Sequence, residues 1–161
     1  MKTILVPVDF SAVTDRVCAT AAELARALAG RVVLLHCIPQ PVVISEYGVM
    51  VDDLAAMDRA AHAAAAKQLS RLRKRLGAVP SESLLFTGAP GPHIVAEAAR
   101  IEADYLVIGS HGHTTFYDLL VGSTTHGVLM KAVCPVVVVH AEPGRQPAAA
   151  IPSPASRKRK A

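Results

Sequence analysis

The clearest chemistry in this 161-residue chain lies in a glycine-rich stretch that also carries hydroxyl side chains. The apolar run 105–108 predicts a buried strand, and Gly109, Gly112 and the pair Gly122-Ser123 follow it. Glycine lets backbone N–H groups approach a ligand closely, and the first turn of a helix adds unpaired N–H donors and a positive dipole end. We expect Ser123 to cap such a helix, with hydroxyls on the next two residues as further donors. The stretch therefore predicts an anion site at the carboxyl end of a strand, suited to phosphate.

A carboxylate, Asp9, ends the first apolar run of the chain. One interpretation is that Asp9 binds ribose hydroxyls or helps to hold a metal ion together with phosphates. The alternative is that it caps the following helix, a role for which Ser11 is also suited. Asp118 is a lone acid that we interpret as a surface residue. The sequence contains no recognisable Ser-His-Asp or paired-carboxylate arrangement, so it predicts no catalytic residue.

Three histidines, His111, His113 and His126, surround the glycine-rich stretch. An H-x-H pair without a Cys or acidic partner at ligand spacing is a weak signal for a metal site. We therefore interpret these histidines as facing solvent or phosphate and assign no metal ligands. His36 lies in a predicted buried strand, where we expect a hydrogen-bonded core residue.

The cysteines, Cys18, Cys37 and Cys134, lie far apart in apolar sequence and form no C-x-x-C pair. This pattern is typical of buried structural thiols in a reduced, cytoplasmic protein. Asp9 interrupts the N-terminal apolar run, which argues against a signal peptide. No window reaches the ~18 continuous apolar residues of a membrane span, so we expect no membrane association.

The formal net charge of +4 comes from the C-terminal end. Residues 141–161 carry Arg145 and the run Arg157–Lys160 against Glu142, and residues 1–140 are neutral. The charge therefore does not predict a domain that binds nucleic acid. We expect one domain over 1–140 and a disordered Pro/Ala-rich basic tail over 141–161. The basic run is interpreted as a solvated tail, with contact to nucleic acid or anionic lipid as the alternative.

Apolar strands alternate with amphipathic helices along the predicted domain. This alternation predicts an α/β fold with a single doubly wound, five-stranded, mainly parallel sheet and helices on both faces. Ligands of such sheets bind beyond the carboxyl ends of the strands, and Asp9, Cys37, Gly88 and Gly109 all lie at such ends. Gly30 is expected to end the first helix. Strands are expected at 2–9, 31–38, 83–87, 105–108 and 136–140, and helices after Ser11, over 52–76, over 93–101 and from Ser123.

The glycine spacing is G-x2-G-x9-G-[ST], which is neither a P-loop nor the dinucleotide fingerprint. Three further segments accompany it: Val6–Ser11, Leu34–Cys37 and Cys134–Val139. With these features, residues 2 to about 140 resemble the universal stress protein family, in the branch that binds ATP. The resemblance implies a Rossmann-like fold of the adenine nucleotide alpha hydrolase type.

The resemblance also implies roles for individual residues. Pro7, Val8 and Cys37 would line the adenine pocket, with Asp9 at the nucleotide. His113 stands where many members carry Lys or Arg, and we keep it as a candidate beside the phosphates. The expected cofactor is ATP, with Mg²⁺ (or Mn²⁺) held through the phosphates. The residues expected around ribose and phosphates are Ile108, Gly109, Gly112, Gly122, Ser123, Thr124 and, as a weaker candidate, Thr125.

The function that follows is a nucleotide-dependent switch or sensor in a stress response. Members that resemble this chain commonly form homodimers through the last strand, here 135–140, and a hydrophobic edge strand of this kind recruits a partner. Two alternatives stay open: a slow ATP-hydrolysing or nucleotidyl-transfer enzyme, and a nucleotide-free dimeric interaction protein.

Overall fold

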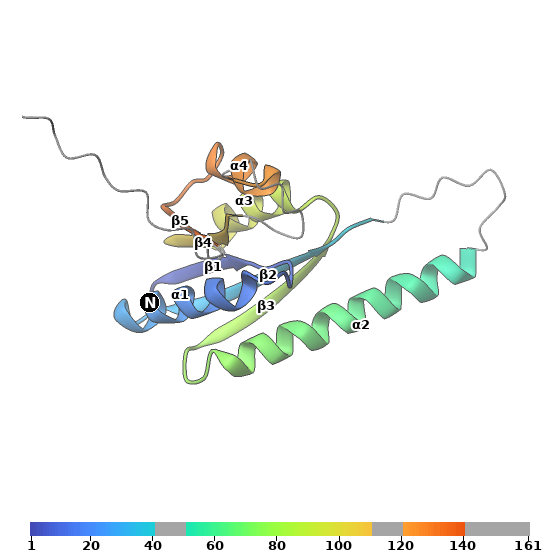
Figure 1. The fold of residues 1–161 in the computed structure, drawn as a ribbon, viewed down its shortest axis with the longest axis horizontal. Helices are drawn as coiled ribbons and strands as arrows, with labels where there is room; N and C mark the ends of the chain where they lie inside the picture. Colours follow the sequence, from blue (N-terminus) through green and yellow to red (C-terminus); the bar gives the residue numbers. More distant parts are fainter. Residues whose placement is uncertain (41–50, 111–120, 141–161) are drawn as a thin grey trace, which may run out of the picture.

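The computed structural model describes residues 1–40, 51–110 and 121–140 of the chain, and of 51–54 the backbone only. Five strands and four helices alternate through these residues, as the sequence predicts (Figure 1). In chain order they are β1 (Thr3–Pro7), α1 (Thr14–Ala27), β2 (Arg31–Ile38), α2 (Val51–Arg75), β3 (Ser81–Thr87), α3 (Pro90–Arg100), β4 (Tyr105–Gly109), α4 (Ser123–Leu129) and β5 (Val136–Val139).

The five strands form one sheet in the order β3-β2-β1-β4-β5, and every neighbouring pair is parallel. The central strand is β1, where Ile4 lies between Val32 of β2 and Tyr105 of β4. The chain moves outward from β1 on one side and returns to build the other side. The strand order therefore reverses between β1 and β4, which is where ligands of doubly wound sheets bind. The predicted fold class is confirmed.

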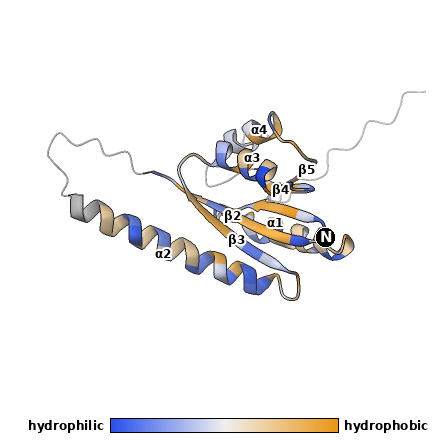
Figure 2. Cartoon of the chain, turned by 180° about the vertical axis from the view of Figure 1, so that it is seen from behind, coloured by the Kyte–Doolittle hydropathy of each residue, from blue (hydrophilic) through white to orange (hydrophobic). Residues whose placement is uncertain are grey.

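Helices cover both faces of the sheet. Ile4 and Val6 pack with the buried faces of α1 and α2, whereas Leu5 packs with α3 and α4. Successive strand residues point to opposite faces, so a strand that is covered on both sides must be apolar throughout. Thr3–Pro7 is buried at every position, and burial on both faces explains the continuous apolar run that starts at Ile4 (Figure 2).

Two predicted helix caps are wrong by one or more residues. Helix α1 begins at Thr14, and Ser11 accepts the Thr14 N–H through its backbone carbonyl at 3.0 Å. The Ser11 hydroxyl is not used as a cap because it donates to Asp9 instead. Helix α4 has Gly122 as its N-cap and Ser123 as its first helical residue, and no side chain caps it.

The end of α1 shows why Gly30 follows it, for a reason other than the predicted one. The left-handed residue is Ala29, with φ of 49°, and the Gly30 N–H donates to the Ala25 carbonyl at 2.8 Å. This is a Schellman ending with alanine in the position that usually holds glycine. Gly30 itself is needed for space, because a Cβ at this position would lie 2.6 Å from the Lys2 carbonyl oxygen.

Helix α2 packs on the sheet through its C-terminal half only. Ala65, Leu69 and Leu72 are buried, followed by Leu76 just beyond the helix, and residues 55–60 are all exposed. Figure 1 shows the N-terminal end of α2 projecting past the strands. None of the helices in the described part of the chain combines the length and apolarity needed to cross a bilayer.

Candidate functional site

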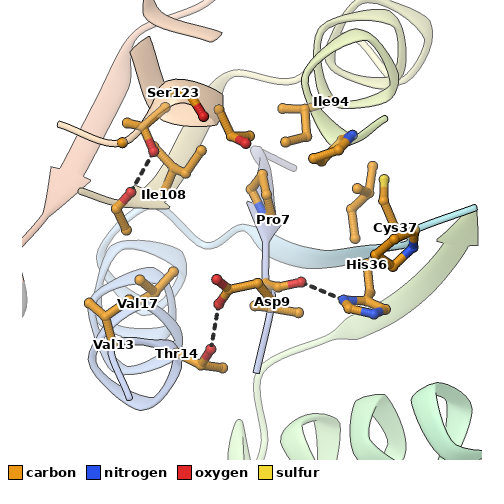
Figure 3. A pocket seen from close by; sticks show the side chains of 18 residues that line it. Pro7, Asp9, Val13, Thr14, Val17, His36, Cys37, Ile94, Ile108 and Ser123 are labelled. Atoms are coloured by element: carbon orange, nitrogen blue, oxygen red, sulfur yellow. Dashed lines mark hydrogen bonds between the residues drawn. The ribbon is translucent and has the colours of Figure 1, made fainter. Parts of the chain in front are cut away.

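A cavity of about 390 Å³ opens at the carboxyl ends of β1, β2 and β4, beside α1, α3 and α4 (Figure 3). This is the point where the strand order reverses. Two predicted site residues, Gly112 and His113, lie outside the described residues. All of the others line the cavity: Pro7, Val8, Asp9, Cys37, Ile108, Gly109, Gly122, Ser123, Thr124 and Thr125.

One part of the cavity wall is apolar and includes residues that sequence reasoning missed. Leu35 and Pro39 lie in and just after β2, beside Cys37, and Ile94 contributes from α3. Ile94 is buried and belongs to the core cluster that α3 forms with the sheet. Ile94 lies far in sequence from the glycine-rich stretch and from Asp9, so no nearby motif predicted its position at the cavity. This wall suits a flat, mostly apolar ring system.

Asp9 brings a carboxylate to the cavity from the end of β1. Its Oδ1 accepts hydrogen bonds from the Ser11 backbone N–H at 3.0 Å and from the Ser11 hydroxyl at 2.6 Å. The Thr14 hydroxyl lies 3.5 Å from the same oxygen and also lines the cavity. Asp9 does not cap α1, which has Val13 as its N-cap and no side-chain cap, and its role toward a ligand stays a prediction. The carboxylate organises the turn before α1, and it does so at the cavity surface.

His36 lies beside Asp9 and has a defined hydrogen-bond partner. Its Nδ1 lies 2.7 Å from the Val8 carbonyl oxygen, and since a carbonyl only accepts, Nδ1 carries the proton and donates. The imidazole also contacts the ring of Phe10, with centroids 4.2 Å apart. The expected hydrogen bond is present, but the prediction of a core residue is wrong, because His36 is partly exposed and lies on the cavity wall. Phe10 has φ of 62°, which is uncommon for an aromatic residue and concentrates backbone strain next to Asp9.

Hydrogen bonds join the ends of the glycine-rich stretch at the other side of the cavity. The Gly122 N–H donates to the Ser110 carbonyl at 2.7 Å, and the Ser110 N–H donates to the Val139 carbonyl of β5 at 2.8 Å. The Thr125 hydroxyl donates to the Gly109 carbonyl at 2.7 Å. The first turn of α4 is therefore held against the carboxyl end of β4.

The hydroxyls of this turn fall into two kinds. Thr125 is buried and has its hydroxyl bonded to the backbone, so it serves the protein rather than a ligand. Ser123 is exposed and Thr124 is partly exposed, and both line the cavity. Gly122 has φ of −67°, which any residue can adopt, so the value of glycine here is the absence of a side chain at the cavity wall.

The described cysteines are free thiols in apolar surroundings. Burial raises the pKa of Cys18 to about 11 and that of Cys37 to about 11, and it also raises the pKa of Cys134. All three are therefore protonated at neutral pH. The prediction of buried thiols is confirmed for Cys18 only, because Cys37 and Cys134 are partly exposed. Cys37 differs from the other two because it lies at the cavity wall.

No group of three or more His, Cys, Asp or Glu side chains that could hold a metal ion occurs among the described residues. His126 is exposed on α4, and His111 and His113 lie outside the described residues. Within this part of the chain, Asp9 is the acidic side chain at the cavity. The described residues at the cavity therefore do not form a metal site by themselves.

Comparison with known proteins decides the family. The model of the universal stress protein family matches residues 1–140. The chain belongs to this family. The match spans every strand and helix of the fold described above, so the cavity is formed entirely by the family's domain.

Relatives of this universal stress protein come from several different organisms. A universal stress protein of Thermus aquaticus is 31% identical over 140 residues, which cover 86% of this chain and 98% of the relative. Universal stress protein Rv2005c of Mycobacterium tuberculosis is 27% identical over 84% of this chain, but the chain spans only 44% of that relative's length. A solved structure of the universal stress protein from Archaeoglobus fulgidus in complex with dAMP is 28% identical, with a TM-score of 0.58, covering 86% of this chain and 97% of that one.

Proposed function

We propose that this universal stress protein binds ATP in the cavity between β1 and β4 and acts as a nucleotide-dependent switch or sensor. The observation that carries the proposal is the composition of the cavity: one wall is apolar, and the other presents a carboxylate, hydroxyls and glycine backbone. A nucleotide has the same division between its base and its sugar and phosphates. The dAMP complex of the Archaeoglobus fulgidus relative supports an adenine nucleotide as the ligand class.

The residues present fit such a ligand. The adenine would pack against Pro7, Val8 and Cys37, and the cavity volume of about 390 Å³ falls within the usual range for small-molecule sites. Asp9 would accept hydrogen bonds from the ribose hydroxyls. Ile108 would contact the ribose. The phosphates would lie against the backbone of Gly109 and Gly122 and the side chains of Ser123 and Thr124, with Gly112 and His113 as further proposed contacts.

A divalent cation, Mg²⁺ (or Mn²⁺), would be held mainly by the phosphate oxygens, since the described residues alone offer no metal site. Its contribution when bound is to neutralise phosphate charge. The protein's own contribution is positioning: Ser11 orients the Asp9 carboxylate, and Thr125 fixes the first turn of α4. No described side chain at the cavity has the arrangement of a catalytic base, and we propose binding rather than rapid turnover.

A switch requires the ligand to favour one state of the protein over another. The Gly122 N–H donates a 2.7 Å hydrogen bond to the Ser110 carbonyl, and these two residues flank the segment 111–121 in the sequence. We propose that nucleotide binding acts on this segment and thereby on a partner's binding surface.

The proposed assembly is a homodimer through β5. This strand pairs with β4 on one side and has no second neighbour among the described strands. Its residues are Val136–Val139, and three of the four remain partly exposed. An apolar edge strand of this kind favours pairing with another strand, and two copies of β5 would leave the two cavities on separate subunits.

The test is nucleotide content followed by titration. The protein is purified without added ligand and denatured, and the supernatant is resolved by anion exchange. Apo protein is then titrated with ATP and Mg²⁺ by calorimetry. Gly122→Val, which places a side chain at the cavity wall, should abolish binding. Gly127→Ala is the matched control, because a Cβ there meets nothing within 4 Å. Absence of both bound nucleotide and titration heat up to millimolar ATP would refute the proposal.

A further inference from the structure

The charges of the neutral domain are not evenly distributed. The stretch between Asp58 and Glu82 contains Lys and Arg residues but no Asp or Glu. All of these residues lie on α2, and those from Lys67 onward occupy its C-terminal half, which packs on the sheet. Figure 2 shows hydrophilic residues spaced along this part of the helix. The basic residues are Arg59, Lys67, Arg71, Arg73, Lys74 and Arg75.

Three of these side chains share the outer face of α2. Lys67, Arg71 and Lys74 are separated by four and three residues, so they lie above one another on the helix. Leu69 and Leu72 are buried on the opposite face, against the sheet. Lys67, Arg71 and Lys74 are all exposed, and we refer to them as the α2 basic stripe.

The stripe is not explained by the stability of the fold. Like charges at these spacings repel and destabilise a helix by roughly 0.2–0.5 kcal/mol per pair. Basic residues in the last turn offset this by interacting with the helix dipole, but Lys67 and Arg71 lie before that turn. Arg75, beside the stripe, pairs with Asp15 of α1. None of the stripe residues forms an ion pair with an acidic side chain in the described ranges.

We propose that the α2 basic stripe is a binding surface for the phosphate backbone of nucleic acid, independent of base sequence. From Lys67 to Lys74 the stripe extends about 10 Å along the helix, at ~1.5 Å per residue. Measured along the duplex axis, this length corresponds to about three phosphates of one DNA strand, at ~3.4 Å each. Exposed Gln68 and Ser70 beside it are further donors of the kind that contact phosphates.

The residues around the stripe favour nucleic acid over a membrane surface or a protein as the partner. Binding to a membrane surface would need exposed apolar side chains to enter the lipid, whereas the leucines of the C-terminal half of α2, where the stripe lies, are buried in the core. A protein partner would be expected to find aromatic or Met anchors. The exposed residues next to the stripe are small or polar, including Ala63, Ala64, Gln68 and Ser70, and the exposed Met57 lies ten residues before Lys67.

The experiment must separate the stripe from the basic run Arg157–Lys160. The full chain is therefore used with these four residues changed to Gln, and fluorescence anisotropy measures binding to a labelled 20-nucleotide RNA and a 20-base-pair DNA between 50 and 200 mM salt. We expect a Kd of about 10⁻⁴–10⁻⁶ M that weakens with salt. Lys74→Glu should weaken binding about tenfold and lower the salt slope by about one phosphate contact.

The matched control is Lys131→Glu, which makes the same charge change at an exposed residue outside α2. It should leave the affinity within about twofold of the parent, while replacing all three stripe residues by Gln should abolish binding. Circular dichroism checks that each variant is folded. The proposal is overturned if the Gln-substituted tail alone abolishes binding, if Lys131→Glu weakens binding as much as Lys74→Glu, or if the protein binds phosphatidylserine vesicles but neither nucleic acid.

Discussion

The hydroxyl of Thr125 donates a 2.7 Å hydrogen bond to the carbonyl of Gly109, joining the first turn of α4 to the last residue of β4. Thr125 is buried, and both residues line the cavity. This bond places Gly122, Ser123 and Thr124 at a fixed position relative to the sheet. The polar side of the site therefore depends on a residue whose own hydroxyl is already used.

Replacing Thr125 by Val should separate this positioning role from packing. The substitution keeps the shape of the side chain but leaves the Gly109 carbonyl without its donor, which should cost about 1–3 kcal/mol in the free energy of unfolding. ATP affinity should fall as well. Thr125→Ser, which retains the hydroxyl, should keep most of both. Urea denaturation and calorimetric titration measure the two effects, and equal behaviour of Val and Ser would show that the hydroxyl has no role.

Asp9 and Ser11 should act as a pair. Asp9→Asn should reduce ATP affinity about tenfold or more, because hydrogen bonds to a charged group contribute about 1.5–3 kcal/mol. Ser11→Ala removes the 2.6 Å hydrogen bond that orients Asp9 and should produce a smaller loss in the same direction. Once Asp9 is Asn, adding Ser11→Ala should have little further effect. Titration of the single and double variants tests this, and additive losses would contradict the pairing.

Cys37 offers a chemical probe of the cavity. With a pKa of about 11, only about one thiol in a thousand is ionised at pH 8, so alkylation by iodoacetamide should be slow and should accelerate as the pH rises toward 11. The same rise in pH that speeds alkylation should lower the stability of the folded protein. A raised thiol pKa favours the folded protein fully below about pH 8.5, the value for a free thiol, and this contribution is lost as the pH rises toward 11.

Bound ATP should slow alkylation of Cys37 but leave Cys18, which lies outside the cavity, unchanged. Peptide mass spectrometry resolves the two thiols in one sample. Equal protection of both would indicate a general stabilisation of the fold, and no protection of Cys37 would place the ligand elsewhere.

Replacement of glycine by alanine should have opposite effects on stability at Gly30 and at Gly127. At Gly30 a Cβ would lie 2.6 Å from the Lys2 carbonyl oxygen, so Gly30→Ala must displace backbone and should destabilise the protein by about 1–3 kcal/mol. At Gly127, inside α4, a Cβ meets nothing within 4 Å, and Gly127→Ala should stabilise by up to about 1 kcal/mol. Thermal denaturation of both variants gives the comparison. A stable Gly30→Ala would show that the turn after α1 relaxes.

Much of this architecture was predictable because the signals are local. The apolar run of β1 and the Ala/Leu repeat of α2 specify their elements within a few residues. The strand-end positions of Asp9, Cys37 and Gly109 were predictable for the same reason. These elements and strand-end positions follow from chain direction and from the pattern of apolar residues, both of which can be read from the sequence.

The missed features depend on contacts between distant segments. Ile94 reaches the cavity from α3, and no pattern near it predicts that position. Ser11 has the residue type of a cap, but its hydroxyl bonds Asp9 because the turn after β1 places them together. Gly30 resembles a helix terminator, yet its Cβ position is excluded by Lys2 at the start of the chain. Local propensity cannot distinguish such competing uses of one residue.

The central position of β1 also has a consequence for synthesis of the protein. Ile4 pairs with Tyr105, about a hundred residues later, and such distant pairing gives a high contact order and slow folding. A ribosome releases β1 first, but the neighbour that completes its pairing emerges only after two-thirds of the chain. Until then one edge of the central strand stays open, and this nascent intermediate is the species most exposed to aggregation. Chaperone dependence during translation, rather than the stability of the finished fold, is therefore expected to limit the yield of soluble protein.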